Sequence, residues 1–164
     1  MYQNSKRLRS GSFYFRQLCV CGETLTHLSF SREKRLLSNR QFKAVLAHGI
    51  RSRNELFTLY IAENDKGQAR LGISVRRSSG KSVVRNRIKR LVREAFRQSQ
   101  DMLPVGFDYL VLVSPELSAD LHKKETSRKI LNLVTFERVR TSLLGLIKKA
   151  MKKHTRNRDG EGCV

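Results

Sequence analysis

Two hydrophobic periods follow one another along this chain, and each predicts a different kind of element. Apolar and polar residues alternate over residues 56–62 and 71–76, which predicts two strands. Apolar residues three and four positions apart predict a helix over residues 83–100 and a final helix whose apolar face runs from Phe136 to Ala150. Residues 107–113 are almost entirely apolar, which is typical of a strand buried on both faces.

Local capping and turn signals add the connections between these elements. Ser38 and Gln41 have the spacing of a capping box, so a short helix is expected to begin here and to end at Gly49. The turn residues 64–67 separate the first two strands and predict a hairpin. Residues 116–130 are polar and charged, and we expect a loop there.

The elements predict one folded domain with a tail at each end. Their order is helix, two or three strands, helix, strand and helix, packed as a layered α+β structure. Residues 1–29 show no period and are interpreted as a mobile N-terminal extension, or as upstream sequence included by a wrong start codon. Residues 30–151 form the expected domain, and residues 152–164 form a basic flexible tail.

The net charge of the chain gives the first indication of function. The 164 residues carry a formal net charge of +20, and self-repulsion of that size opposes a compact state unless a polyanion relieves it. Nucleic acid is the favoured partner, and an anionic membrane surface is the alternative. No apolar run reaches the roughly 20 residues that span a bilayer, so we expect a cytoplasmic protein without a membrane partner.

The predicted helix over residues 83–100 carries the densest positive charge. Residues 76–97 contain nine Lys or Arg and a single acid, Glu94. A solvated surface helix normally mixes signs, whereas here like charges stand four apart, as in Lys89 and Arg93. A helical wheel places one set of polar side chains opposite the apolar stripe, namely Asn86, Lys89, Arg90, Arg93 and Arg97, with Arg85 and Arg87 at its flanks. This face is the first candidate RNA-binding site.

The loop before this helix extends the candidate site. It carries Arg76, Arg77 and Lys81, and it leads into a helix N-terminus whose free N–H groups favour anions. Gly80 allows the backbone to turn and to approach a phosphate closely.

A second candidate surface combines apolar and aromatic side chains. Phe42 and Leu46 lie on the first helix, and Phe57 and Tyr60 lie on the first strand but on opposite faces of it. Aromatic rings beside a sheet stack on unpaired bases, although Phe57 equally suits plain core packing. No catalytic set accompanies these surfaces, because the four histidines are scattered without a paired carboxylate or a nucleophile motif.

The basic helix also carries a family resemblance. The run Arg-Asn-Arg-Ile-Lys-Arg-Leu-Val-Arg-Glu-Ala-Phe over residues 85–96 closely resembles the signature helix of the bacterial ribonuclease P protein subunit. Further matches occur in the order that this family shows, at Arg35-Leu36, Phe42, His48-Gly49, Phe57 to Tyr60, Leu71 to Val75 and Asp108-Tyr109. The resemblance covers roughly residues 30–150.

The resemblance implies a fold and a function. The fold is a two-layer α/β sandwich of the ribosomal protein S5 domain 2-like type, with about four strands, three helices and a left-handed βαβ crossover. The holoenzyme removes the 5′ leader of precursor tRNA, and its chemistry belongs to a catalytic RNA that uses Mg²⁺. The protein binds that RNA and the leader, without a DNA partner and without catalytic or metal-binding residues of its own.

The matched motifs carry two sets of residues over to this chain. The signature helix gives Arg85, Asn86, Arg87, Lys89, Arg90 and Arg93 as contacts to the catalytic RNA. A leader-binding cleft between the sheet and the first helix takes Phe42, Thr58 and Tyr60, with Leu46 where the family often has an aromatic residue. Two other hypotheses remain open at this point: a ribosomal or nucleoid-type binding module, and a nuclease with its own active site.

Overall fold

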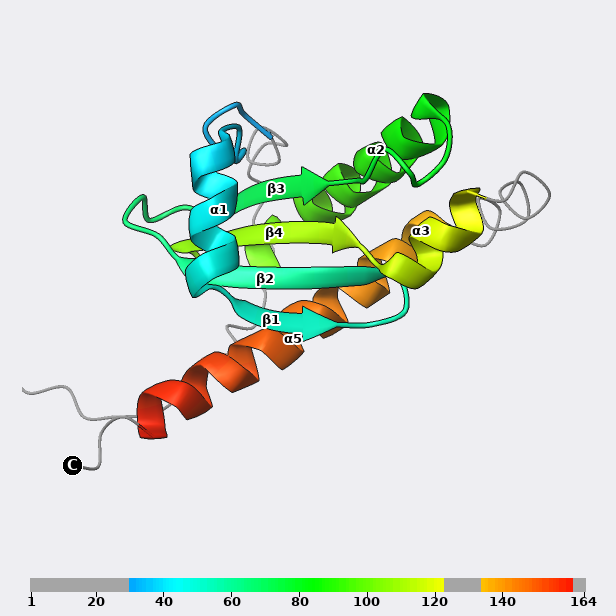
Figure 1. The fold of residues 1–164 in the computed structure, drawn as a ribbon. Helices are drawn as coiled ribbons and strands as arrows, with labels where there is room; N and C mark the ends of the chain where they lie inside the picture. Colours follow the sequence, from blue (N-terminus) through cyan, green and yellow to red (C-terminus); the bar gives the residue numbers. More distant parts are fainter. Residues whose placement is uncertain (1–29, 123–133, 161–164) are drawn as a thin grey trace, which may run out of the picture.

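A four-stranded mixed sheet organises the chain in the computed structural model, which describes residues 30–122 and 134–160 (Figure 1). The strands are β1 (Ile50–Arg53), β2 (Phe57–Glu63), β3 (Arg70–Ser74) and β4 (Phe107–Val113), in the spatial order β1-β2-β4-β3. The predicted N-terminal extension, including Cys19, Cys21 and His27, lies outside the described residues.

The predicted hairpin between β2 and β3 is wrong. The turn is present, with Gly67 at φ +63°, but β4 lies between the two strands. β4 pairs antiparallel with β2 and parallel with β3. The reason is burial: β4 is the most apolar strand, and Leu110 and Val111 on its two faces are both almost fully buried, so it takes a central position.

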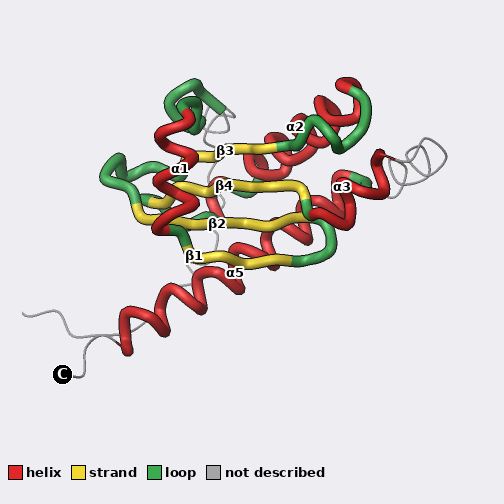
Figure 2. The backbone as a smooth tube through the Cα atoms, viewed as in Figure 1, coloured by secondary structure: helices red, strands yellow, loops and turns green. Residues whose placement is uncertain are grey.

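Helices cover both faces of this sheet (Figure 2). They are α1 (Asn39–His48), α2 (Ser82–Gln98), α3 (Pro115–His122) and α5 (Phe136–Gly160), with a short 3₁₀ turn, η2 (Gln100–Met102). α1 crosses one face, and α2 and α5 lie on the opposite face (Figure 1). The main core fills the space under α2 and α5 and includes Phe57, Ile88, Phe96, Tyr109 and Leu143.

The connection from β3 through α2 to β4 is a left-handed crossover. Both strands point to the right in Figure 1, β4 lies below β3, and α2 lies behind the sheet. Connections between parallel strands are right-handed in about 98% of cases, so this sense is rare. It agrees with the fold that the resemblance implied.

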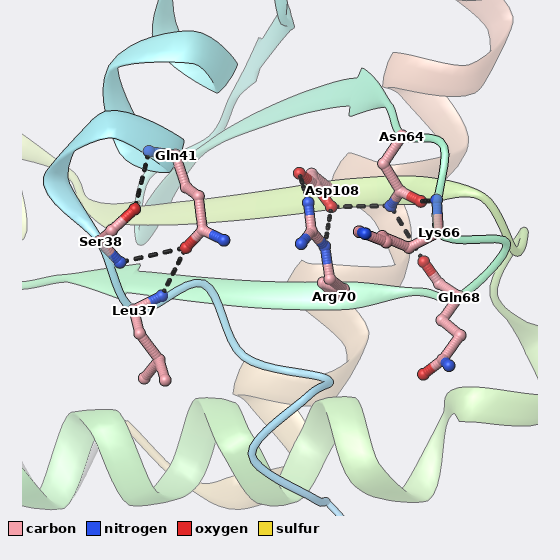
Figure 3. A network of polar contacts seen from close by, with 8 residues as sticks. All are labelled: Leu37, Ser38, Gln41, Asn64, Lys66, Gln68, Arg70 and Asp108. Carbon is pink, nitrogen blue, oxygen red and sulfur yellow. Dashed lines mark hydrogen bonds and ion pairs between the residues drawn. The ribbon is translucent and has the colours of Figure 1, made fainter.

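The predicted capping box at the start of α1 is confirmed (Figure 3). The Ser38 hydroxyl accepts from the Gln41 N–H at 3.2 Å, and Gln41 Oε1 accepts from the N–H groups of Ser38 at 3.1 Å and Leu37 at 2.9 Å. Gly49 ends the helix with an ordinary φ of −79°. Glycine is needed there because a Cβ would lie 2.2 Å from the Val45 carbonyl oxygen.

Three further differences from the sequence prediction concern short or terminal segments. β1 was not assigned, because four residues are too few to show a period. The expected loop over residues 116–130 begins as helix α3, which Ser114 caps by accepting from the Leu117 N–H at 3.2 Å. The expected flexible tail from Lys152 is helical as far as Gly160. Residues 123–133 lie outside the described residues.

A buried polar network holds β3 against β4 (Figure 3). The Asp108 carboxylate accepts from Arg70 Nε at 2.7 Å, from Arg70 Nη2 at 2.6 Å and from Asn64 Nδ2 at 2.7 Å. Arg70 and Asp108 are register partners in the parallel pair. The network therefore ties the turn after β2 and the edge strand β3 to the centre of the sheet.

Candidate nucleic-acid interface

The helix α2 separates its apolar and cationic side chains cleanly. Five residues of the stripe are buried against the sheet and α5: Val84, Ile88, Val92, Ala95 and Phe96. The opposite face exposes Asn86, Arg90 and Arg93, and Arg87 beside them is also exposed. The first turn of α2 carries no acidic residue, and its N-cap Lys81 makes no side-chain capping bond. The structure thus brings together the cationic face that the sequence predicted.

Arg85 points back toward the loop before the helix. Its Nη1 donates to the carbonyl oxygens of Arg77 and Gly80, each at 2.9 Å. Those bonds fix the loop over the first turn of α2, while the side chains of Arg76, Arg77 and Lys81 remain exposed. Arg85 therefore organises the cationic loop from within the candidate site.

Helix α3 supports the same loop from the other side. Ser79 is fully buried, and its hydroxyl lies 2.6 Å from the hydroxyl of Ser118. Gly80 has φ +86°, and a Cβ on it would lie 2.8 Å from the Leu121 carbonyl oxygen. Sequence reasoning missed this support, although Pro115 in a first helical turn and the apolar pair Leu117 and Leu121 were signals of a helix.

The last cation of the face is compensated by the single acid. Arg97 donates from Nε at 2.9 Å and from Nη2 at 2.6 Å to the Glu94 carboxylate. Hydrogen bonds from Arg97 and then from Gln98 lower the pKa of Glu94 to about 2. The carboxylate therefore stays ionised, and Arg90 and Arg93 are the exposed cations at the centre of the face.

The second predicted surface lies on the sheet face that α1 crosses. Phe42 and Tyr60 are half-buried there against Leu110, and Leu46 is 43% exposed on α1. Thr58 points to the same face but is only 6% exposed. Phe57 does not belong to this surface: it is fully buried under α2 and α5 on the opposite face, so only the core-packing interpretation fits it.

Two arginines that sequence reasoning did not single out extend this surface. Arg51 is the register partner of Tyr60, and Arg53 is the partner of Thr58, so their side chains share one face. Both are exposed, whereas Ser52 between them is buried. Arg53 also pairs with Glu116 of α3. The Arg-Ser-Arg alternation was the available signal, but it is too short to assign without the strand.

Other kinds of site find less support in the described part of the chain. There, no three His, Cys, Asp or Glu side chains lie together as a ligand set for a metal ion. No helix within the described ranges is long and apolar enough to cross a membrane.

The loop geometry yields a direct test at Gly80. Gly80→Ala should displace the loop, because it adds a clash with the Leu121 carbonyl to the strain of a positive φ. Gly67→Ala is the matched control, since Gly67 also has a positive φ but nothing within 4 Å. We expect the control to cost about 1–2 kcal/mol of unfolding free energy and to keep RNA affinity.

In contrast, Gly80→Ala should cost more stability and also weaken RNA binding. Urea denaturation and a filter-binding titration with a structured RNA measure the two effects. Equal losses of stability in the two variants would show that contact with α3 does not restrict this loop.

Comparison with known proteins places these features in a family. The family model described as ribonuclease P matches residues 30–137, which include α1, the whole sheet, the cationic loop and α2. The chain belongs to the ribonuclease P protein family. Two relatives support this: the ribonuclease P protein component of Brevibacillus brevis is 38% identical over 137 residues, covering 79% of this chain and 97% of the relative. That of Thermotoga maritima is 36% identical over 121 residues, covering 74% and 95%.

Solved structures of ribonuclease P proteins share the fold. The Thermotoga maritima protein aligns with a TM-score of 0.59 at 36% identity, covering 70% of this chain and 96% of that one. The Staphylococcus aureus protein aligns with a TM-score of 0.58 at 26% identity, covering 71% and 94%. The interpretation of the signature helix as a ribonuclease P protein motif is thus confirmed at the level of the family.

Proposed function

We propose that this chain is the protein subunit of a ribonuclease P holoenzyme in the cytoplasm, where it assists a catalytic RNA in removing the 5′ leader of precursor tRNA. The observation that carries the proposal is the exposed cationic face of α2 together with the loop that Arg85 and α3 hold against it. Arginine suits such a face, because its planar guanidinium donates two parallel hydrogen bonds to a phosphate. This face would bind the catalytic RNA.

The sheet face beside α1 suits a different part of the substrate. Single-stranded RNA is held by aromatic rings that stack on bases and by cations that follow the backbone. Phe42 and Tyr60 supply rings here, and Arg51 and Arg53 supply charge along the neighbouring strand. We assign the 5′ leader to this face.

In this proposal the catalytic RNA carries out the chemistry and the protein binds the RNAs. Mg²⁺ would supply the activated water and neutralise charge on the scissile phosphate when it is bound by the RNA. Within the described ranges, no three His, Cys, Asp or Glu side chains lie together where they could ligate such an ion. The protein's part is to bind and orient the two RNAs.

Reconstitution tests this proposal directly. Purified protein would be mixed with a bacterial ribonuclease P RNA at low Mg²⁺, and cleavage of a leader-bearing precursor tRNA would be followed. We expect efficient cleavage where the RNA alone is poor. Binding to the RNA without stimulation of cleavage would point instead to a general structured-RNA-binding module, and cleavage by the protein alone would point to a nuclease.

The leader assignment is tested at Tyr60. Tyr60→Ala should weaken binding of leader-bearing tRNA by about 1–3 kcal/mol, the contribution of one stacked base, with little effect on mature tRNA. Tyr60→Phe is the control, because it keeps the ring and should keep the affinity. Equal losses for both tRNAs in the alanine variant would contradict the assignment.

A further inference from the structure

The C-terminal half of α5 is a second strongly cationic surface, separate from α2. From Arg138 to Arg158 the sequence contains no Asp or Glu. Among the described side chains of the C-terminal half of the helix, five cations are exposed: Lys148, Lys149, Lys152, Lys153 and Arg156. The helix continues past the sheet at its C-terminal end, which is the red end in Figure 1. Neither the family signature nor the proposed function accounts for this charge.

Packing and helix electrostatics do not explain the charge either. Lys148 and Lys152, Lys149 and Lys153, and Lys152 and Arg156 are three like-charged pairs at four-residue spacing, which destabilise an isolated helix. Cations near a helix C-terminus are favourable, but only within about the last turn. Lys148 and Lys149 lie about three turns before Gly160. A polyanion bound along the side of α5 that carries Lys149, Lys153 and Arg156 would relieve the repulsion on that side.

The structure joins this half of α5 to the open edge of the sheet. Lys153 Nζ donates to the backbone carbonyl of Arg51 on the edge strand β1, at 3.1 Å. One helical turn before Lys153, Lys149 lies near Arg53 of β1: both side chains line a hollow between α5 and the β1–β2 turn. On a helical wheel Lys149, Lys153 and Arg156 fall on one side of α5, whereas Lys148 points away from it.

This edge borders the face that we assign to the leader. Arg51 and Arg53 project beside Tyr60 and Thr58, and β1 is the outermost strand on that side. A strand of RNA that leaves Tyr60 across β1 thus meets Arg51 and then Lys153. A stacking ring followed by cations is the arrangement that tracks a single-stranded backbone.

We propose that the distal part of the 5′ leader crosses the β1 edge and binds along Lys149, Lys153 and Arg156 of α5. This inference rests on the proposed function, because it extends the leader-binding face by a second, electrostatic segment. The segment recognises phosphates and not bases, so it favours longer leaders irrespective of their sequence.

The test compares leaders of two lengths on the reconstituted holoenzyme. Precursor tRNAs with leaders of about 4 and about 16 nucleotides, the range of site sizes of small single-strand-binding folds, would be titrated with wild-type protein and with Lys149→Gln/Lys153→Gln. We expect the variant to lose about 5- to 10-fold in affinity for the long leader and less than about 2-fold for the short one. The salt slope for the long leader should fall by about 0.7 for each lost contact.

Two controls make the outcome decisive. Lys148→Gln/Lys66→Gln removes the same charge from exposed positions off this path and should bind both leaders as wild type does. Because Lys153 bonds to β1, Lys149→Gln alone is measured as well and should show part of the same length-dependent loss. Equal losses for both leaders, or a loss of affinity for the catalytic RNA alone, would overturn the inference. If the wild-type holoenzyme binds leader-bearing tRNA no more tightly than mature tRNA, the proposed function is rejected instead.

Discussion

Arg90→Glu/Arg93→Glu is expected to remove most of the protein's affinity for the catalytic RNA. Both side chains are exposed at the centre of the cationic face of α2. Each charge-assisted contact to a phosphate contributes about 1.5 kcal/mol or more, so losing two corresponds to about 100-fold, and the new carboxylates add repulsion. Filter binding at two salt concentrations measures the effect, and the salt slope should fall by about 2.

The same variant should be folded and no less stable than wild type. Arg93 stands four residues from both Lys89 and Arg97, so Glu at this position replaces two like-charged pairs with opposite-charged ones. Arg90 stands four residues before Glu94, so Glu at position 90 creates one like-charged pair, which offsets only part of that gain. Lys66→Glu/Lys148→Glu makes the same change of net charge away from α2 and should leave most of the affinity intact. Comparable losses in the two double variants would mean that overall charge, and not the face of α2, determines binding.

Asp108→Leu should have the largest effect on stability. It leaves Arg70, whose side chain is only 15% exposed, without its carboxylate partner, and it also removes one of the two acceptors of the Asn64 side-chain amide. Breaking a buried ion pair from one side costs about 3–5 kcal/mol, because a buried charge remains uncompensated. The free energy of unfolding in urea measures the loss.

Removing both partners is the informative comparison. Arg70→Met/Asp108→Leu leaves no buried charge, and apolar replacement of such pairs is often neutral or stabilising. We expect the double variant to recover most of the loss of the single one. If it is as unstable as Asp108→Leu, the contribution of Asp108 lies in its bond to Asn64 and the turn after β2, and not in the ion pair.

The crossover places the two surfaces that we propose for RNA binding on opposite faces of one small domain. The chain leaves β3 through the cationic loop, and α2 then returns behind the sheet, on the face opposite α1 (Figure 1). The catalytic RNA and the leader are therefore assigned to different layers of the molecule, and neither competes with the other for side chains. Arg85 and Ser79 belong to the junction between these layers.

The sequence alone determined the properties that depend on local spacing. The stripe of Ile88 and Val92 and the opposed face of Arg90 and Arg93 follow from helical geometry, and both are present as expected. The capping box of α1 involves residues three apart and needs no tertiary contact. The family could also be inferred at this stage, because its signature lies within one continuous helix.

Only the tertiary structure decided which residues from distant segments meet. The strand order β1-β2-β4-β3 places the most apolar strand, β4, at the centre of the sheet, where its side chains are buried on both faces. The local turn residues after β2 wrongly favoured a hairpin with β3. The sequence does not show which face of β2 is buried. In the structure α2 and α5 pack on the face that carries Phe57, so Phe57 does not belong to the leader surface. Arg51 and Lys153 lie 102 positions apart, and only the path of α5 along β1 brings them together. Contacts of this kind depend on how the whole chain packs, and the local hydrophobic period carries no information about them.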